Sequence, residues 1–550
     1  MRFELEHDWQ GNMSTPRAKV GERAKAHLLI LLCAIWLIMG LIGHAPWKPL
    51  ESHTVSTIKH VLDQGQWLMP TSMTEQQLDN PPLYYIVGAV FARIFQDLLP
   101  MHDAARMTSG LWMVLTLLLI GMSGRELWGK GFGRQTTFIF IASIGLVVSA
   151  HTLTPMLSAL TGVAMGFYAL ALAKRRPYRA GILLGVGLAI GFLSTGILPF
   201  SIILLTSLML PLFFDNWRSH GFLVTLGVAM MVAIPITLTW LFLAYQHHPE
   251  MLLSWWHANT QVRKTTHFFF LRTLVWYAWP ALPLSIWALW RYRDQWWVRP
   301  KFQLSSTFFV IAFVLIGFFS NDNEIFALPL LVPLTAIAGG GIETLKRGAA
   351  GALNWFGLML FGLIGFLIWL GWWALLTGNP VHLKNRMIFL SGMQQLSFQV
   401  IAFSAACLVT LIWLFAVFRS QHSSRSVATN WAIGMTMAWT LLMTLWLPMI
   451  DSARSYESVF LGIRKVLPEK YACVNTHYFG KSQQDLLYYY TGVKAQAFEV
   501  TQQLNCDLYL IQDERGRERI EPNQSWRLIW QGKRSSERRE SFRLYQFQAS

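Results

Sequence analysis

The chain has 550 residues, of which 53% are hydrophobic and only 13% are charged, and its formal net charge is +16. A soluble globular protein carries about 25% charged residues, so this composition excludes an ordinary soluble protein. The positive charge does not indicate a nucleic-acid partner either. The basic residues lie mainly in loops between apolar segments, where the positive-inside rule accounts for much of the excess.

The chain opens with a polar segment, residues 1–25, whose basic residues favour a cytoplasmic location. Apolar runs of roughly 16 to 25 residues then recur from Ala26 to Ile450, and a helix needs about 20 such residues to cross a membrane. No small-residue cleavage site follows the first run, so we expect a retained helix rather than a signal peptide. The sequence predicts an α-helical polytopic membrane domain over residues 26–450, with about 13 spans.

Loop charge predicts the side of the membrane that each connection faces. From Arg125 onward, basic loops alternate with less basic connections. Two apolar segments separate one basic loop from the next basic loop. The positive-inside rule puts the basic loops in the cytoplasm. It puts outside the loop 44–82 (the first loop), the segments near 151–157, 194–198, 246–270, 320–326 and 377–397, and everything after Asp451. We therefore expect a multi-pass protein of a bacterial inner membrane with a periplasmic C-terminal domain.

One segment conflicts with this alternation. Residues Leu83 to Phe95 are apolar but short, and they contain Arg93. Counting them as a span would leave the basic loop at Arg125 outside. Two interpretations stay open: the segment lies along the membrane surface or enters it only partway, or the loop at Arg125 breaks the charge rule.

The composition of the spans excludes two classes of transporter. They contain almost no Asp, Glu or Lys, which argues against ion-coupled transport. The absence of a Walker-type phosphate loop argues against an ATP-driven pump. No spacing of cysteines suggests zinc and no metal motif is seen, so any cofactor stays unknown.

The first loop carries three short motifs in a definite order. They are Pro46-Trp-Lys-Pro-Leu-Glu51-Ser-His53, Val61-Leu-Asp-Gln-Gly-Gln-Trp-Leu-Met-Pro70 and Leu78-Asp79-Asn80-Pro81-Pro82-Leu83-Tyr84-Tyr85. Further motifs follow at Ala104–Gly129, Thr152–Pro155, Phe318–Ser320 and Leu328–Pro333. The order of these motifs over nearly the whole chain resembles the bacterial GT-C glycosyltransferases of the protein O-mannosyltransferase and lipid A aminoarabinose transferase superfamily.

This resemblance implies that the chain takes a sugar from a polyprenyl-phosphate donor and passes it to a lipid or protein acceptor outside the membrane. Membrane lipid is then an expected partner. Such a reaction needs a carboxylate at the outer surface to take the acceptor's proton. It also needs basic groups that hold the leaving phosphate as charge develops on it.

The sequence departs from the superfamily pattern at several motif positions. Leu50 stands where the first-loop Asp is usual, Asn80 where the Lys before Pro-Pro is usual, and Met156 where an Asp follows Thr-Pro. Thr195-Gly196-Ile197 replaces a Lys-Gly-Pro turn, and Asp322 and Glu324 stand where a basic residue is expected. Two alternatives to a transferase therefore remain. One is a catalytically impaired relative that binds prenyl lipid or a partner protein, and the other is a lipid or sugar carrier.

Candidate site residues come from the connections expected outside. Glu51 is the candidate general base or acceptor-orienting acid, the alternative being a solvated loop carboxylate. Asp79 is the second catalytic candidate, the alternative being a helix cap. The candidate substrate-binding residues are His53, Asn80, Arg263, Lys264, Arg272, Lys384 and Arg386. We expect Glu51 and Asp79 on one wall of a cavity that opens sideways to lipid, with at least one of Arg263, Lys264 and Arg272 on another.

The C-terminal residues 451–550 are predicted to form a small α/β domain with no catalytic constellation. A helix is predicted over Tyr456–Val466, and strands over Tyr471–Asn475, Asp507–Gln512, Trp526–Trp530 and Phe542–Phe547. Cys473 and Cys506 each start an apolar strand in a compartment that we expect to be oxidising. We expect the two cysteines to lie within bonding distance or nearly so.

Overall fold

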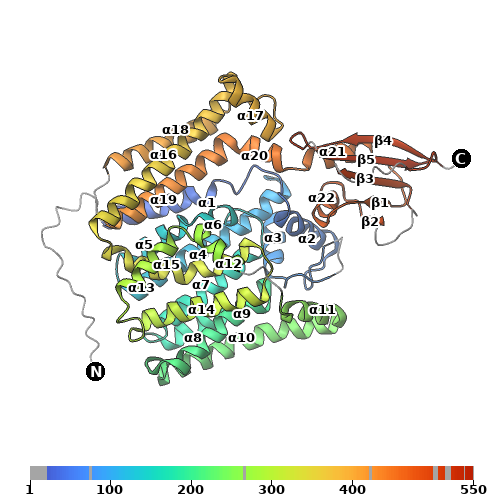
Figure 1. Cartoon of the computed structure of the whole chain (residues 1–550). Coiled ribbons are helices and arrows are strands. Elements are labelled where there is room, and N and C mark those ends of the chain that lie inside the picture. Colours follow the sequence, from blue (N-terminus) through green and yellow to red (C-terminus); the bar gives the residue numbers. More distant parts are fainter. Residues whose placement is uncertain are drawn as a thin grey trace.

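A computed structural model describes residues 22–72, 77–263, 268–419, 424–498, 506–514, 522–537 and 539–548. Most of the chain forms a helical bundle, and a small mixed sheet lies at one end of it (Figure 1). The predicted fold class, a polytopic α-helical membrane protein with a small C-terminal α/β domain, is confirmed.

The bundle is made of helices of very unequal length. They are α1 (Glu22–Ile38), α4 (Met101–Trp128), α5 (Phe132–Ile141), α6 (Ile144–Ser149), α7 (Met156–Leu172), α8 (Pro177–Thr195), α9 (Ile197–Phe213), α10 (His220–His247), α12 (Phe269–Tyr277), α13 (Ala281–Arg291), α14 (Pro300–Phe319), α15 (Leu328–Gly341), α16 (Arg347–Thr377), α18 (Val400–Arg419), α19 (Ser424–Leu441) and α20 (Leu447–Arg454). Short helical turns lie at η1 (Asp215–Trp217), η2 (Glu324–Ala327), η3 (Ile342–Thr344) and η4 (Leu442–Trp446).

Many of these helices can cross a membrane. Among the described residues, 8 helices are long and apolar enough to do so, counting η2 to η3 and α19 to α20 each as one. Shorter apolar helices lie at Ala26–Ile38, Leu83–Ile94, Met156–Leu172 and Ile197–Phe213. The chain is thus a multi-pass membrane protein, while the number of about 13 spans stays a prediction from segment length.

Glycines bring α7 and α8 into close contact. A Cβ atom built on Gly162 would lie 2.7 Å from the backbone nitrogen of Gly191, and one built on Gly187 would lie 2.9 Å from that of Gly166. Each helix carries its two glycines four residues apart, on one face. Without a water-driven force between helices in lipid, such close backbone packing is a main source of association.

Four further helices lie outside the stack of long helices, at the end that carries the sheet (Figure 1). They are α2 (Leu50–Gln64), α3 (Leu83–Ile94), α11 (Pro249–Thr260) and α17 (Val381–Ser391). The helices α2, α11 and α17 belong to three connections that loop charge assigns to one side of the membrane, and all three helices lie at this end (Figure 1).

Both ends of α3 lie near the C-terminal domain. The segment before α3 reaches it through His53, which contacts Asp79 and Asp485. The start of α4, which follows α3, reaches it through a 2.8 Å hydrogen bond between His102 Nδ1 and the Tyr489 hydroxyl. A helix that starts and ends at one end of the bundle does not carry the chain across. This geometry favours the interpretation of residues 83–95 as a surface segment, while the side that the Arg125 loop faces stays a prediction from loop charge.

The C-terminal domain contains a five-stranded sheet in the order β2-β1-β3-β5-β4. Its strands are β1 (Val474–His477), β2 (Ala495–Ala497), β3 (Leu508–Glu514), β4 (Trp526–Gly532) and β5 (Glu540–Phe547). β1 is parallel to β2 and β3, whereas β5 is antiparallel to β3 and β4. The helices α21 (Glu457–Val466) and α22 (Lys481–Thr491) share one apolar core with the sheet.

The predicted proximity of the two C-terminal cysteines is confirmed. Cys473 and Cys506 form a disulfide with a Cα–Cα separation of 4.8 Å. It joins the chain just before β1 to the chain just before β3, and these two strands are hydrogen-bonded neighbours. Sequence analysis predicted α21 and four of the strands but missed α22 and β2.

Candidate active site

Helix α2 lies between the bundle and the C-terminal domain and presents a different polar group to each. Glu51 and His53 are two residues apart, so their side chains leave nearly opposite faces of the helix. Glu51 points to α4, and His53 points to α22 and to the segment before α3. The polar sequence of α2, with few apolar residues, suits a helix that is in contact with polar groups on both sides.

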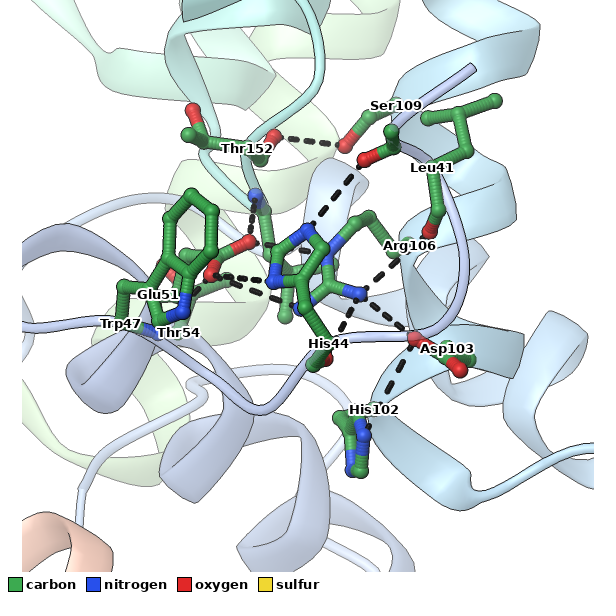
Figure 2. Close-up of polar contacts among 12 residues, drawn as sticks. Leu41, His44, Trp47, Glu51, Thr54, His102, Asp103, Arg106, Ser109 and Thr152 are labelled. Atoms are coloured by element: carbon green, nitrogen blue, oxygen red, sulfur yellow. Dashed lines mark hydrogen bonds and ion pairs between the residues drawn. The ribbon is translucent and has the colours of Figure 1, made fainter. Parts of the chain in front are cut away.

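Glu51 is bound in a closed network of hydrogen bonds (Figure 2). Its Oε1 accepts from Arg106 Nε at 2.9 Å and from the backbone nitrogen of Leu153 at 2.9 Å. Its Oε2 accepts from the backbone nitrogen of Trp47 at 2.9 Å and from Arg106 Nη2 at 3.4 Å. The Glu51 side chain is 1% exposed. Both of its oxygens are therefore engaged, and neither faces water.

Arg106 extends this network to a second acidic residue. Its Nη1 donates to Asp103 Oδ1 at 2.6 Å and to the backbone oxygens of Leu41 and His44, each at 3.3 Å. Figure 2 shows the guanidinium between Glu51 and Asp103. One cation thus joins α2 and α4 to the chain after α1.

The environment of Glu51 stabilises its charged form. Burial alone would raise the pKa of this carboxyl, but the charges of Arg106 and His44 and the hydrogen bonds from Arg106 and Trp47 outweigh it and hold the pKa below its usual value. The contacts correct one expectation: Glu51 is not a solvated loop carboxylate. Its hydrogen bonds hold the first loop against α4 and the 151–155 turn.

The opposite face of α2 carries a second group of charges. His53 Nε2 lies 2.7 Å from Asp79 Oδ2, and its Nδ1 lies 3.4 Å from Asp485 Oδ2 in α22. The exposed fractions of the side chains are 28% for His53, 42% for Asp79 and 2% for Asp485. Burial alone would lower the pKa of His53, but the hydrogen bonds and charges of the two carboxylates raise it to about 10. The imidazole is therefore a cation at neutral pH.

The segment before α3 holds Asp79 at the surface. α3 itself begins at Leu83, after Pro81 and Pro82, which restrict the backbone before it. The Asp79 carboxylate contacts His53 instead of the start of α3, so the interpretation of Asp79 as a helix cap is wrong. Asn80 Nδ2 donates to the Tyr85 hydroxyl at 3.4 Å, which ties the amide to the first turn of α3.

The predicted basic residues lie in two other connections. Arg263 donates from its backbone nitrogen to Phe318 at 2.9 Å and from Nη2 to the backbone oxygen of Ala258 at 3.1 Å. Arg272 is exposed on α12, and Lys264 lies outside the described residues. On α17, Lys384 is half-buried, and the Arg386 guanidinium lies 5.4 Å from the centre of the Phe389 ring. Arg263 is thus hydrogen-bonded to α11 and to the end of α14.

Sequence analysis missed two residues that organise this region. Arg106 is a charge within a membrane-spanning helix, and such a charge is by default expected to have a partner or a function, so a signal was present. Asp485 lies 432 residues from His53 in the sequence, and nothing local to α22 indicates that contact. Among the residues that the structure describes, no group of three or more His, Cys, Asp or Glu is placed to hold a metal ion.

The bundle, the surface helices and the terminal sheet together define the class of protein. They form the GT-C type of membrane glycosyltransferase fold, as the motifs of the first loop predict. The structure matches the crystal structure of ArnT from Cupriavidus metallidurans in the apo state with a TM-score of 0.70, over 95% of this chain and 98% of that one, at 15% identity. The form of that protein bound to undecaprenyl phosphate matches with a TM-score of 0.67 over the same shares, at 14% identity.

Sequence comparison leads to the same group of proteins. The chain is 25% identical over 365 residues to undecaprenyl phosphate-alpha-4-amino-4-deoxy-L-arabinose arabinosyl transferase 1 of Pseudomonas fluorescens strain Pf-5, covering 62% of this chain. It is 22% identical over 443 residues to the corresponding transferase of Serratia proteamaculans strain 568, covering 77% of this chain and 76% of that protein. The match spans 64% of the length of the Pseudomonas relative. No protein-family model matches the chain. The resemblance stated from the motifs is confirmed.

Proposed function

We propose that this chain is a membrane glycosyltransferase that moves a sugar from a polyprenyl-phosphate donor to a lipid or protein acceptor. The names of the relatives and the GT-C fold support the reaction class. The observation that carries the assignment to this chain is the pair of Asp79 and His53. It offers a partly exposed carboxylate beside a cation, at the end of the bundle where the surface helices gather.

The reaction uses these groups in a simple way. The bond between the anomeric carbon of the sugar and the phosphate oxygen breaks, and a bond to the acceptor oxygen or nitrogen forms. Asp79 takes the proton that the acceptor loses. The leaving polyprenyl phosphate gains negative charge, which nearby cations stabilise. Glu51 keeps the first loop in position through Arg106 and does not touch the substrates.

The donor phosphate is proposed to bind among the remaining candidate residues. His53 and Asn80 lie beside Asp79, and Arg263 follows α11, which lies at the same end of the bundle (Figure 1). Lys264 and Arg272 are the other proposed contacts from this stretch of the sequence. Lys384 and Arg386 on α17 are further proposed contacts for the phosphate or for lipid headgroups. A prenyl tail enters from the bilayer, so this site lies at the membrane boundary.

We further propose that the N-terminus is cytoplasmic and that the C-terminal domain lies in the periplasm of a bacterial inner membrane. The positive-inside pattern supports this orientation. The Cys473–Cys506 disulfide supports it independently, because disulfides persist in oxidising compartments such as the periplasm.

Transfer by the purified full-length chain tests the proposal. The protein is reconstituted in nanodiscs with undecaprenyl-phosphate sugars and an extract of bacterial membrane lipids and proteins. Mass spectrometry then follows the free undecaprenyl phosphate and the glycosylated acceptor. We expect wild-type protein to release the carrier and label an acceptor, and Asp79→Asn to lower that rate by about 100-fold or more.

Asp63→Asn is the matched control. Asp63 is also in the first loop, and its side chain is 41% exposed against 42% for Asp79. It accepts a hydrogen bond from Tyr488 of the C-terminal domain. The amide oxygen of this variant can still accept the hydrogen bond from Tyr488, so the variant should transfer at close to the wild-type rate. Equal rates for wild-type protein and Asp79→Asn would mean that Asp79 is not the general base.

A second candidate function is that of an impaired relative that binds prenyl lipid without transferring sugar. The closed network around Glu51, together with Leu50, Asn80 and Met156 at positions where the superfamily is charged, favours it. Binding of undecaprenyl phosphate with no sugar transfer in the same assay would support this function. Movement of the lipid-linked sugar across the bilayer without transfer would support the carrier instead.

A further inference from the structure

The C-terminal domain contributes a buried carboxylate to the neighbourhood of the proposed site. Asp485 lies on α22 with its side chain 2% exposed, and its Oδ2 lies 3.4 Å from His53 Nδ1. The other ring nitrogen of His53 lies 2.7 Å from Asp79. The three residues come from α22, α2 and the segment before α3, so the contact joins the domain to the first loop.

We propose that Asp485 is a positioning residue for transfer, acting through His53 to hold the Asp79 carboxylate in its working orientation. The proposal rests on the proposed function and makes the C-terminal domain a part of the active site. Asp485 fixes one nitrogen of the imidazole, and the charged ring then fixes one oxygen of Asp79. The Asp79 side chain is 42% exposed, so an acceptor can still approach its carboxylate.

Other contacts hold the domain in the place that this role requires. Tyr488, three residues after Asp485, donates to Asp63 Oδ2 at 2.9 Å, and Tyr489 contacts His102. Lys48 in the first loop donates to the Tyr456 hydroxyl, which in turn donates to Glu540. Because several bonds fix the orientation of α22 against α2, Asp485 meets His53 in a defined geometry.

The groups around His53 determine how the pair responds to pH. Asp79 faces it from the segment before α3, and Asp485 faces it from α22. On α3, the Tyr85 phenol is near both carboxylates, and its pKa is raised by burial and by their charges, so it stays neutral. The charges that act on the imidazole are thus those of the two carboxylates. Removal of one of the two carboxylates should lower the pKa of His53 from about 10 toward the ordinary 6.5.

Histidine hydrogen–deuterium exchange on the full-length protein tests this without reference to activity. In wild-type protein, His53 should remain protonated between about pH 5 and pH 9. In Asp485→Asn, which keeps the shape of the side chain, a titration of His53 should appear within that range. A wild-type His53 that titrates near 6.5, or a titration that Asp485→Asn leaves unchanged, would overturn the proposal even if transfer is observed.

Kinetics supply the second measurement. We expect Asp485→Asn to lower kcat by roughly 10-fold with little change in KM, and to move the alkaline limb of the pH profile to lower pH. Once His53→Gln is present, Asp485→Asn should cause no further loss, because its effect passes through His53. A wild-type rate and profile for Asp485→Asn would overturn the positioning role. A shifted His53 titration without transfer in any variant would instead contradict the proposed function.

Asp513→Asn is the control for a merely structural effect. Asp513 pairs with Arg543 between β3 and β5, with Arg543 Nη2 at 2.6 Å from Asp513 Oδ1. This variant destabilises the same domain but leaves the charges around His53 intact. It should lower thermal stability without moving the titration of His53 or the pH profile. A shift equal to that of Asp485→Asn would mean that loss of domain stability, not the contact with His53, causes the effect.

Discussion

Glu51 Oε1 lies 2.9 Å from Arg106 Nε, although the two side chains are only 1% and 0% exposed. A buried ion pair adds little net stability, because desolvation of the charges offsets their attraction. Loss of one partner is different, since it leaves the other charge buried and unpaired. The pair therefore makes the first loop depend on α4 for its position.

Arg106→Met should destabilise the protein strongly, because both Glu51 and Asp103 then lose their cation. We expect a loss of about 3–5 kcal/mol in the free energy of unfolding. The midpoint of thermal unfolding in detergent, followed by size-exclusion chromatography, measures it. The double variant Arg106→Met with Glu51→Gln should recover part of the loss.

Arg175→Met serves as the comparison for Arg106. Arg175 also pairs with a glutamate at 2.9 Å, Glu126, but its side chain is 65% exposed. Such an exposed pair contributes about 1 kcal/mol or less. Equal losses for Arg106→Met and Arg175→Met would mean that the Glu51 network does not hold the loop.

Glu51→Gln separates positioning from catalysis. The amide keeps the shape of the carboxylate but loses the charge that faces Arg106, so we expect a loss of about 2 kcal/mol in stability. Transfer per folded molecule should remain within a few-fold of wild type. Normal stability with abolished transfer would return Glu51 to the role of general base.

The apolar runs along the chain were sufficient to predict the fold class, and the positions of Cys473 and Cys506 at the start of apolar strands were sufficient to predict their proximity. The motifs of the first loop supplied Glu51, His53 and Asp79 as site candidates. They could not predict which face of α2 each residue occupies, because a motif does not specify what packs on either side of a helix. The position of the Glu51 side chain depends on Arg106, and the protonation state of His53 depends on Asp485. Both partners lie in other elements, and the second is far away in the sequence.

Stability should depend on pH through His53. Its pKa is raised in the folded protein from 6.5 to about 10, so the folded state binds the proton more tightly than the unfolded chain. The resulting stabilisation is fully present below pH 6.5 and is lost as the pH rises through about 10. The difference in the midpoint of thermal unfolding between wild type and His53→Gln should therefore shrink over this range. A difference that is constant with pH would mean that His53 is not charged in the folded state.

Chemical labelling of single cysteines tests the orientation on which the proposed site depends. A cysteine at Asn259, in α11, should react in intact cells with a reagent that does not cross the inner membrane. One at Arg293, in the basic connection between α13 and α14, should react only after the membrane is opened. Replacing the native free cysteines Cys33 and Cys407 with serine first removes the background, while the disulfide-bonded pair is retained.

The reverse labelling pattern would put α2 and the C-terminal domain in the cytoplasm, because these elements lie at the same end of the bundle as α11 (Figure 1). Asp79, which contacts His53 of α2, would then be cytoplasmic as well. The proposed periplasmic reaction would then be wrong, while the fold would stand.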